Sequence, residues 1–213
     1  MKEMQTLQRK FSQLLSRIRD HQIVMGITGG SGSGKSTIAE IVKRKLSELQ
    51  VNIVHLDQFF IPVDEMPKYF SKYHGNYQPN FNRPEAINFQ SMIAFCNVLE
   101  NADLHILDGH FALYDPQMRE LMDVKCFVSI DIDEMLKRRT IRNLKNSYGG
   151  SETNIRHYNK ECVVPMYEEY ILPCQEYADI LISNSNTDIA ERNLVIEALC
   201  ASISKKINDG PKE

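Results

Sequence analysis

The chain has 213 residues, 42% of them hydrophobic, and a formal net charge of -3 at pH 7. That length and apolar content are enough for one α/β domain with a core of its own. A weakly negative charge balance argues against general binding to nucleic acid, although local basic clusters can still bind phosphates. We therefore expect one globular domain and no nucleic-acid partner.

We find no recognisable targeting signal, and this observation and the cysteine usage both predict a cytoplasmic protein. Charged residues interrupt the segment 1–20 throughout, and no later run reaches the ~18 apolar residues of a membrane span. The five cysteines are an odd number without C-x-x-C spacing, which is typical of reduced thiols rather than of a disulfide framework or a zinc site. We expect a cytoplasmic protein without a membrane partner.

Apolar residues near the N-terminus recur at steps of three and four, which predicts an amphipathic helix over 4–18. Its apolar stripe either packs on the core or joins two copies of the chain, so a homo-oligomer is one expectation. We divide the chain into this helical segment (1–22), a main domain (23–207) and a flexible tail (208–213). The apolar positions are Met4, Leu7, Phe11, Leu14, Leu15 and Ile18.

The main domain alternates apolar runs with segments of helical periodicity. Such alternation predicts an α/β fold, in which helices cover both faces of a parallel sheet in three α/β/α layers. The predicted sheet has five strands, at 23–28, 51–56, 104–108, 125–130 and 178–183. The predicted helices lie at 35–50, 86–100, 133–146, 153–175 and 187–206.

Residues 58–85 break this rhythm, since they are rich in proline and aromatic residues and lack sustained periodicity. We predict a long loop there. Loops of that length in compact domains tend to bind ligands or to act as lids. Its aromatic side chains either hold a planar ligand or anchor the loop to the edge of the sheet.

The stretch "GGSGSGKS" (29–36) matches G-x-x-x-x-G-K-[ST] and lies between an apolar run and a helical segment. Glycines let successive N–H groups turn inward around phosphate oxygens, and the start of a helix adds partial positive charge. Lys35 then reaches the β- and γ-phosphates, while the Ser36 hydroxyl is placed to bind Mg²⁺. The motif indicates a nucleoside triphosphate as donor and leaves the acceptor open. The predicted nucleotide contacts are Gly29, Gly30, Ser31, Gly32, Ser33, Gly34, Lys35, Ser36 and Thr37.

In "LHILDGH" (104–110), Asp108 ends an apolar run, so it lies at the carboxyl end of a strand, where open α/β sheets bind ligands. We predict that Asp108 is the acidic ligand of the magnesium ion; the alternative is an acid that belongs to a D-G turn. His110 follows closely, and it either faces the same crevice or has a structural role.

Arginines for the transferring phosphoryl group are predicted in "MLKRRTIRNLK" (135–145). Helical spacing of three between Arg139 and Arg142 directs both guanidinium groups to one side. Permanent charge and bidentate geometry suit arginine to phosphate. A solvated basic helix face is the alternative, and the glycines in "NSYGGSET" provide a place for the hinge of a lid.

Asp57, in "HLDQFF" (55–60), ends the second predicted strand and therefore lies at the same sheet edge. Three roles remain open from the residues alone. It can cap a turn, act on the magnesium ion through water, or accept the proton of the acceptor hydroxyl.

Taken together, these motifs resemble the uridine kinase-like family of P-loop small-molecule kinases, which also includes nicotinamide riboside kinases and phosphoribulokinases. The resemblance covers residues 23–184. It rests on "GITGGSGSGKST", "LDQFF", "NFNRPEAINF", "ILDGHFALYDPQMRELMDVKCFVSIDIDEMLKRRTIRNL" and "VVPMYEEYILPCQEYADILI". It implies a P-loop kinase fold with a small helical lid, and ATP or GTP with Mg²⁺ as cofactors.

The resemblance also implies roles for single residues. Asp57 matches the catalytic acid that accepts the hydroxyl proton, and Lys35 matches the phosphate-binding lysine. Ser36 and Asp108 match the magnesium residues. Arginines of the lid are matched by Arg139 and Arg142, which with Asp57 and Lys35 form the predicted catalytic set. The predicted acceptor-binding residues are Asp57, Phe60, Tyr77, Phe81, Asn82 and His110.

Three departures from the family pattern matter, two for the acceptor and one for the phosphate-facing cations of the lid. Asn82 stands where the family has an aspartate that holds the sugar hydroxyls, so its hydrogen bonds lack charge assistance. The segment "SYG" (147–149) replaces the R-G-R motif of the lid. The β-hairpin that recognises uracil in uridine kinases, between the segments that correspond here to 86–100 and 104–108, is missing.

From these residues and the resemblance we predict a phosphotransferase that uses ATP and Mg²⁺ to phosphorylate the 5′-hydroxyl of a nucleoside, nominally uridine or cytidine. One alternative is a kinase for another small metabolite, such as nicotinamide riboside. A second is a nucleotide-binding regulator with weak catalysis, which the changes at Asn82 and in the lid would favour.

Overall fold

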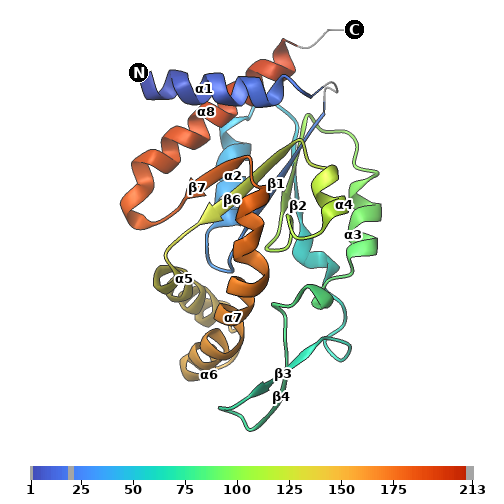
Figure 1. The fold of residues 1–213 in the computed structure, drawn as a ribbon, viewed down its shortest axis with the longest axis vertical. Coiled ribbons are helices and arrows are strands. Elements are labelled where there is room, and N and C mark those ends of the chain that lie inside the picture. The colour runs from blue at the N-terminus through green and yellow to red at the C-terminus, as the bar shows by residue number, and fades with distance from the viewer. Residues whose placement is uncertain (1, 19–21, 210–213) are drawn as a thin grey trace.

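A five-stranded parallel sheet forms the centre of the molecule (Figure 1). The computed structural model describes residues 2–18 and 22–209. Because the strands are parallel, their carboxyl ends meet at one edge of the sheet, with the P-loop following the central strand. In spatial order the strands are β2 (Val51–His55), β5 (Leu104–Asp108), β1 (Ile23–Gly29), β6 (Val124–Ser129) and β7 (Ile180–Ser183). All five predicted strands are confirmed.

Helices cover both faces of this sheet, as the alternation of strands and helices predicted. Two separate apolar clusters result, because successive strand residues point to opposite faces. Cys126 lies in the cluster with α2 and α8, whereas its neighbour Phe127 lies in the cluster with α3 and α4. The helices are α1 (Lys2–Leu15), α2 (Lys35–Lys45), α3 (Phe89–Cys96), α4 (Pro116–Glu120), α5 (Ile132–Lys145), α6 (Glu152–Tyr158), α7 (Val164–Met166) and α8 (Ile189–Asn208).

The predicted helix over 153–175 is not one regular α-helix. After α6 the chain continues as two π-helical turns on either side of α7, and then as a 3₁₀ helix (Leu172–Tyr177). Pro165 and Pro173 lack the N–H group that a regular helix needs, which accounts for part of this change in winding. The prediction of a helical segment is confirmed, while its regularity is wrong.

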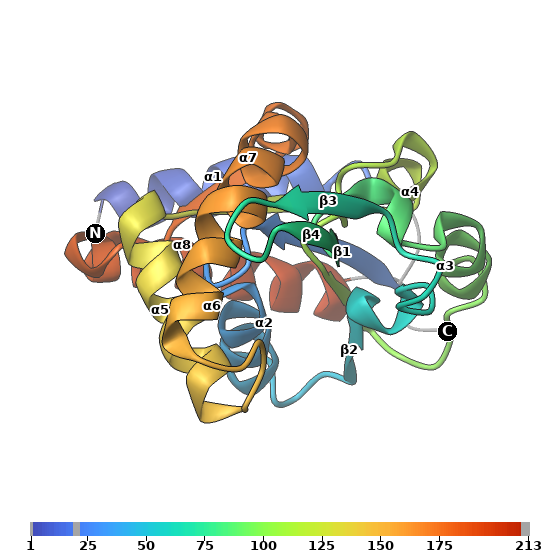
Figure 2. The same ribbon diagram turned by 90° about the horizontal axis from the view of Figure 1, so that it is seen from below.

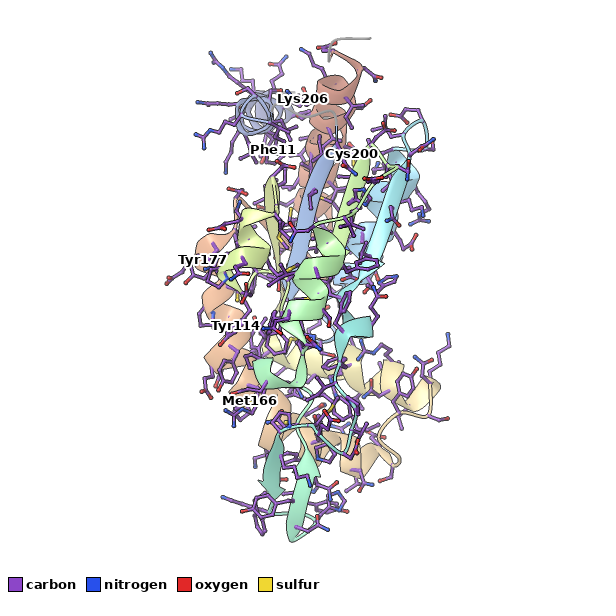
Figure 3. All side chains as sticks on the ribbon, turned by 90° about the vertical axis from the view of Figure 1, so that its right-hand side faces the viewer. Phe11, Tyr114, Met166, Tyr177, Cys200 and Lys206 are labelled. Carbon is purple, nitrogen blue, oxygen red and sulfur yellow. The ribbon has the colours of Figure 1, made fainter. Side chains whose placement is uncertain are left out.

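Helix α1 packs on α8 at the end of the molecule opposite the functional edge of the sheet (Figure 1). Phe11 and Leu15 are buried in the cluster that also holds Cys200, and Figure 3 shows α1 end-on beside α8. Lys206 donates a hydrogen bond of 2.6 Å to the carbonyl oxygen of Ile18. This arrangement supports core packing as the role of the apolar stripe.

Parts of the predicted terminal segments lie outside the described residues, namely 1, 19–21 and 210–213. Within the described part, Asn208 is the last residue of α8, so the helix extends into the predicted tail.

The prediction of an irregular loop over 58–85 is wrong at its centre, where β3 (Lys68–Ser71) and β4 (Asn76–Pro79) form an antiparallel hairpin. Its strands are only four residues long and half of their residues are exposed, so they lack the alternating apolar pattern that reveals longer strands. The hairpin instead binds a distant segment, since Ser71 Oγ donates to Glu161 Oε2 at 2.7 Å. Figure 2 shows it beyond the sheet, between α6 and α3.

All five cysteines are free and buried, in agreement with the prediction of reduced thiols. Burial raises the pKa of the Cys126 and Cys200 thiols to about 12, so these sulfurs remain protonated at neutral pH. No described helix combines the length and the apolar content that crossing a membrane requires.

Candidate active site

A cleft of about 970 Å³ opens at the carboxyl edge of the sheet. Its walls come from the P-loop, the ends of β2 and β5, the β3–β4 hairpin, and helices α5 and α6. The structure therefore brings together residues that are more than a hundred positions apart. The predicted site residues that line the cleft are Ser31, Lys35, Ser36, Asp57, Phe60, Phe81, Asn82, Asp108, His110, Arg139 and Arg142.

The P-loop connects β1 to α2, with the conformation that its glycines predicted. Gly32 and Gly34 have φ angles of +100° and +93°, in the left-handed region that favours glycine. A Cβ at Gly34 would also lie 2.2 Å from Nδ2 of Asn184, which itself donates to the carbonyl oxygen of Ser33. The loop is thus held from outside by Asn184, while Ser33 N–H donates to the carbonyl oxygen of Gly30 at 3.0 Å within the loop.

Lys35, the first residue of α2, lies half-buried in this loop and donates to the carbonyl oxygen of Gly30 at 3.2 Å. Burial lowers the pKa of its ammonium group, and the positive charge of Arg142 acts in the same direction. Asp108 and Asp57 act oppositely and favour the charged form. The charges of both carboxylates therefore reach the ammonium group, which lies beside the loop where phosphate would bind.

Asp108 ends β5 and is buried, with 5% of its side chain exposed. Its Oδ2 lies 3.0 Å from Nδ1 of His55, whereas its buried Oδ1 has no hydrogen-bond partner among the described residues. Ser36 adds a hydroxyl group to the same cleft. A hydroxyl and one carboxylate are ligands of the kind that Mg²⁺ accepts when substrate phosphates supply further oxygens, so these residues fit the ion.

No cluster of three or more His, Cys, Asp or Glu side chains in the described ranges, 2–18 and 22–209, could hold a metal by itself. A metal at this edge would therefore share its coordination with the nucleotide, as magnesium does in phosphoryl transfer.

Asp57 lies in a short 3₁₀ turn (Leu56–Phe59) just after β2, and 69% of its side chain is exposed to the open cleft. The surrounding protein raises the pKa of its carboxyl, but contact with His110 and the charges of Lys35 and Arg142 outweigh that effect. The net pKa lies below the ordinary aspartate value, so the group is ionised at neutral pH.

Helix α5 places both predicted arginines at the cleft, but they differ in exposure. Arg139 is 9% exposed, donates to Oδ1 of Asn159, and lies with its guanidinium carbon 5.4 Å from the centre of the Tyr158 ring. Arg142 is exposed and donates to the Ser31 hydroxyl of the P-loop at 3.1 Å. Both arginines therefore line the cleft, and Arg142 contacts the P-loop directly.

The acceptor side of the cleft contains a polar network that joins the hairpin segment to α6. Asn82 is 9% exposed and donates through Nδ2 to the Tyr158 hydroxyl at 2.9 Å and to Cys162 Sγ at 3.6 Å. The thiol in turn donates to Asn80 Oδ1 at 3.0 Å. Asn82 Oδ1 accepts no hydrogen bond from the described residues, so it is available to a ligand hydroxyl.

Aromatic side chains line the same side of the cleft as Asn82, but the predicted contact Tyr77 is not among them. Phe60 meets Phe81 edge-on with ring centroids 5.8 Å apart, and both line the cleft. Tyr77 does not line it: its side chain is 69% exposed on the hairpin and packs against Phe70. The neighbouring Tyr69 contributes instead and meets Tyr158 edge-on at 5.6 Å.

Sequence reasoning missed several residues that line the cleft, among them Tyr69, Tyr158 and His55. Tyr69 and Tyr158 come from the overlooked hairpin and from the end of α6, and only a long-range contact joins them. His55 contacts Asp108 because the two residues are register partners on β2 and β5. The position of His55 at the end of its strand, two residues before Asp57, is the sequence signal that could have placed it beside Asp108.

Comparisons with known proteins agree with this geometry. Residues 95–191 match a family model described as Phosphoribulokinase / Uridine kinase family, and residues 6–96 match one described as Zeta toxin. The chain is 29% identical over 185 residues to "Uridine kinase" of Clostridium botulinum (strain Kyoto / Type A2), which covers 75% of this chain and 87% of that protein.

Eukaryotic relatives match along most of the chain. It is 25% identical over 211 residues to "Uridine-cytidine kinase B" of Dictyostelium discoideum, covering 87% of this chain and 84% of that protein. It is 26% identical over 212 residues to "Uridine kinase-like protein 4" of Arabidopsis thaliana, covering 88% of this chain but 44% of that protein.

Solved structures share the fold at low sequence identity. A structure assigned to a fructose transport system kinase from Silicibacter sp. TM1040 aligns with a TM-score of 0.58 and 18% identity, covering 82% of this chain and 98% of that chain. "Possible Uridine Kinase" from Bacillus stearothermophilus aligns with a TM-score of 0.51 and 14% identity, covering 84% and 98%.

The chain has the α/β fold of P-loop kinases. The matched relatives and the family model show that it is a phosphotransferase. The predicted resemblance to the uridine kinase-like family of P-loop kinases is confirmed.

Proposed function

We propose that this phosphotransferase moves the γ-phosphoryl group of ATP to a hydroxyl group of a nucleoside-like acceptor, nominally the 5′-hydroxyl of uridine or cytidine. The observation that carries the proposal is that Asp57 shares one cleft with the P-loop on one side and with the hairpin wall on the other. A donor site and an acceptor site thus meet at an ionised carboxylate.

The donor is held by the P-loop N–H groups, from Gly29 to Thr37, and by the Lys35 ammonium group. GTP fits the same phosphate contacts, and the phosphate contacts alone do not separate the two nucleotides. Ser36 and Asp108 Oδ1 would hold the magnesium ion, which when bound neutralises phosphate charge. Arg139 and Arg142 supply fixed positive charge from the lid.

In the transfer step the acceptor oxygen forms a bond to the γ-phosphorus while the bond to the β–γ bridging oxygen breaks, and ADP leaves. The proton of the acceptor hydroxyl moves to Asp57. Its lowered pKa keeps this carboxylate ionised, and therefore able to accept a proton, at neutral pH. Positioning and charge neutralisation supply most of the catalysis in such reactions.

Asn82 supports a sugar acceptor in place of the aspartate of the family pattern. Because Nδ2 is engaged by Tyr158 and Cys162, the amide presents its oxygen to the cleft. An amide oxygen accepts hydrogen bonds from ribose hydroxyls, although without the strength of a charged acceptor. Phe60, Phe81 and Tyr69 offer apolar faces beside it for a planar base.

The test is an acceptor panel that measures ADP release from ATP, or GDP release from GTP. The acceptors are uridine, cytidine, purine nucleosides, nicotinamide riboside and a 5′-deoxynucleoside. We expect turnover with at least one ribonucleoside and none with the 5′-deoxy compound. Turnover of the 5′-deoxy compound, or of non-nucleoside alcohols alone, would contradict the proposal. A preference for nicotinamide riboside would assign the chain to the alternative metabolite.

A second candidate function, a nucleotide-binding regulator, is favoured by the lid. Residues 147–149 line the cleft but contribute Ser147, Tyr148 and Gly149, and none of these carries a positive charge. If ATP binds in calorimetry while the whole panel stays unphosphorylated, this candidate replaces the kinase.

A further inference from the structure

The ends of β2 and β5 carry the same two residue types in opposite order. Residues 55–57 read His-Leu-Asp and residues 108–110 read Asp-Gly-His. His55 and Asp108 are register partners, and Nδ1 of His55 lies 3.0 Å from Asp108 Oδ2. Two residues further along, Nδ1 of His110 lies 3.6 Å from Asp57 Oδ1. Each histidine thus contacts the aspartate of the other segment.

The middle residues of the two triplets explain how the segments stay close enough for both contacts. Leu56 is buried, and a Cβ at Gly109 would lie 2.7 Å from the Leu56 Cβ. Only a residue without a side chain permits that approach, so Gly109 keeps the two segments at contact distance. The first and third residues of each triplet then contact the other segment, through the pairs His55–Asp108 and Asp57–His110.

In the His110–Asp57 pair, the histidine side chain is largely buried and the aspartate side chain is exposed in the cleft. His110 has 12% of its side chain exposed, and its ring lies between Phe60 at 5.7 Å and Phe111 at 4.2 Å. Its carbonyl oxygen accepts a hydrogen bond of 2.7 Å from the Thr28 hydroxyl on β1. The Asp57 side chain is 69% exposed and makes no other close polar contact among the described residues.

In the other pair the burial is reversed. Asp108 is 5% exposed and His55 is 59% exposed. The contact with His55 occupies Asp108 Oδ2 and leaves the buried Oδ1 without a partner. Each pair therefore joins one buried side chain to one that is exposed in the cleft.

We propose that His110 and His55 are positioning residues, which act through crossed contacts. His110 fixes the Asp57 carboxylate toward the acceptor hydroxyl, and His55 fixes the Asp108 carboxylate so that Oδ1 faces the nucleotide phosphates. The roles of both aspartates rest on the proposed function, while the crossed contacts themselves rest on the geometry alone.

The chain permits a matched test, because both histidines use Nδ1. An asparagine side chain places its amide N–H group near the position of Nδ1, whereas glutamine places it near Nε2. We expect His110→Gln and His110→Phe to lower kcat about 10- to 100-fold, because small displacements of a catalytic group cost rates of that order. His110→Asn should recover most of that loss, and thermal melting will show whether each variant folds.

A pH profile separates positioning from packing. Burial raises the pKa of Asp57, and the contact and charge of His110, with the charges of Lys35 and Arg142, lower it. Removing His110 takes away two of the lowering influences, so the Asp57 pKa should rise. The acid limb of kcat/KM should then move to higher pH in His110→Gln and less in His110→Asn. Equal loss in both variants at every pH, with an unmoved acid limb, would overturn the proposal for His110.

The contact is also testable if the chain phosphorylates no acceptor, which would refute the proposed function. Carboxyl ¹³C shifts of labelled aspartate report the Asp57 pKa directly, with Asp57→Asn identifying the signal. A pKa that rises in His110→Gln and is restored in His110→Asn supports the crossed contact. A pKa that is the same in wild type and His110→Gln overturns it.

The His55 contact predicts a different phenotype. In His55→Gln the affinity for ADP with Mg²⁺ should fall about tenfold in titration calorimetry, because residues that orient metal ligands have effects of that order. Affinity for ADP without Mg²⁺ should be unchanged, and His55→Asn should resemble wild type. An equal change with and without Mg²⁺ in His55→Gln would overturn this part of the proposal.

Discussion

The two walls of the cleft are built in different ways. The phosphate wall is largely one continuous stretch, 29–37, whose glycines, lysine and serine are adjacent in the chain. The acceptor wall joins the hairpin segment to the region around α6, through contacts such as Asn82 to Tyr158 and Ser71 to Glu161. Because the phosphate wall is one contiguous stretch, its function can be recognised from a sequence motif. The acceptor wall depends on contacts between distant segments, so a few substitutions among those contacts can change which ligand it binds.

Substitution of Asp57, which lies between the two walls, should lower kcat more than any other change. Asp57→Asn removes the proton acceptor but keeps the shape of the side chain, so kcat should fall roughly 10²–10⁴-fold. ATP affinity, measured by calorimetry, should change little. Gln58→Glu at the adjacent exposed position is a control for a general change in charge. An unaltered rate in Asp57→Asn excludes the base role.

On the phosphate wall, Lys35→Met should lower kcat about 10²–10³-fold, because it removes a fixed positive charge from the transferring group. ATP affinity should fall, and acceptor affinity should stay close to wild type. The matched control is Lys45→Met at the far end of α2, where the lysine pairs with Glu197 at the surface. Equal weakening of acceptor and ATP binding would contradict the separation of the two walls.

On the acceptor wall, Asn82→Ala should raise the KM for the acceptor about tenfold, since about one hydrogen bond to a ligand hydroxyl is lost. The KM for ATP should be unchanged. Asn82→Asp tests the departure from the family pattern, and its charged oxygens should lower the acceptor KM below that of wild type. If both variants change the KM for ATP instead, Asn82 does not belong to the acceptor wall.

The smallest effect is expected at Tyr77, which we predicted as a ligand contact and which the structure places outside the cleft. Tyr77→Ala should change the acceptor KM less than about twofold, whereas Tyr69→Ala should raise it several-fold through loss of an aromatic contact. Steady-state kinetics on the two variants side by side test the position of the hairpin. A larger effect at Tyr77 would mean that the hairpin turns its other face to the ligand.

These differences also explain what could be predicted before the structure. Strands such as β1 and β5 were found because their apolar runs are almost fully buried, and Asp57 and Asp108 followed from their positions at strand ends. The hairpin was missed because its short strands have exposed aromatic residues such as Phe70. Tyr158 was missed because its partner Asn82 is 76 positions away, and no local pattern encodes such a contact.

The most direct measurement of the central claim is a single-turnover experiment with [γ-³²P]ATP, Mg²⁺ and a preferred ribonucleoside, quenched at short times and separated by chromatography. We predict that the label moves from ATP to the nucleoside monophosphate in wild type, and that Asp57→Asn binds the same nucleotide but slows this transfer at least about 10²-fold. Label that stays in ATP, or appears only as inorganic phosphate with every acceptor, would contradict phosphoryl transfer to a nucleoside hydroxyl in this cleft.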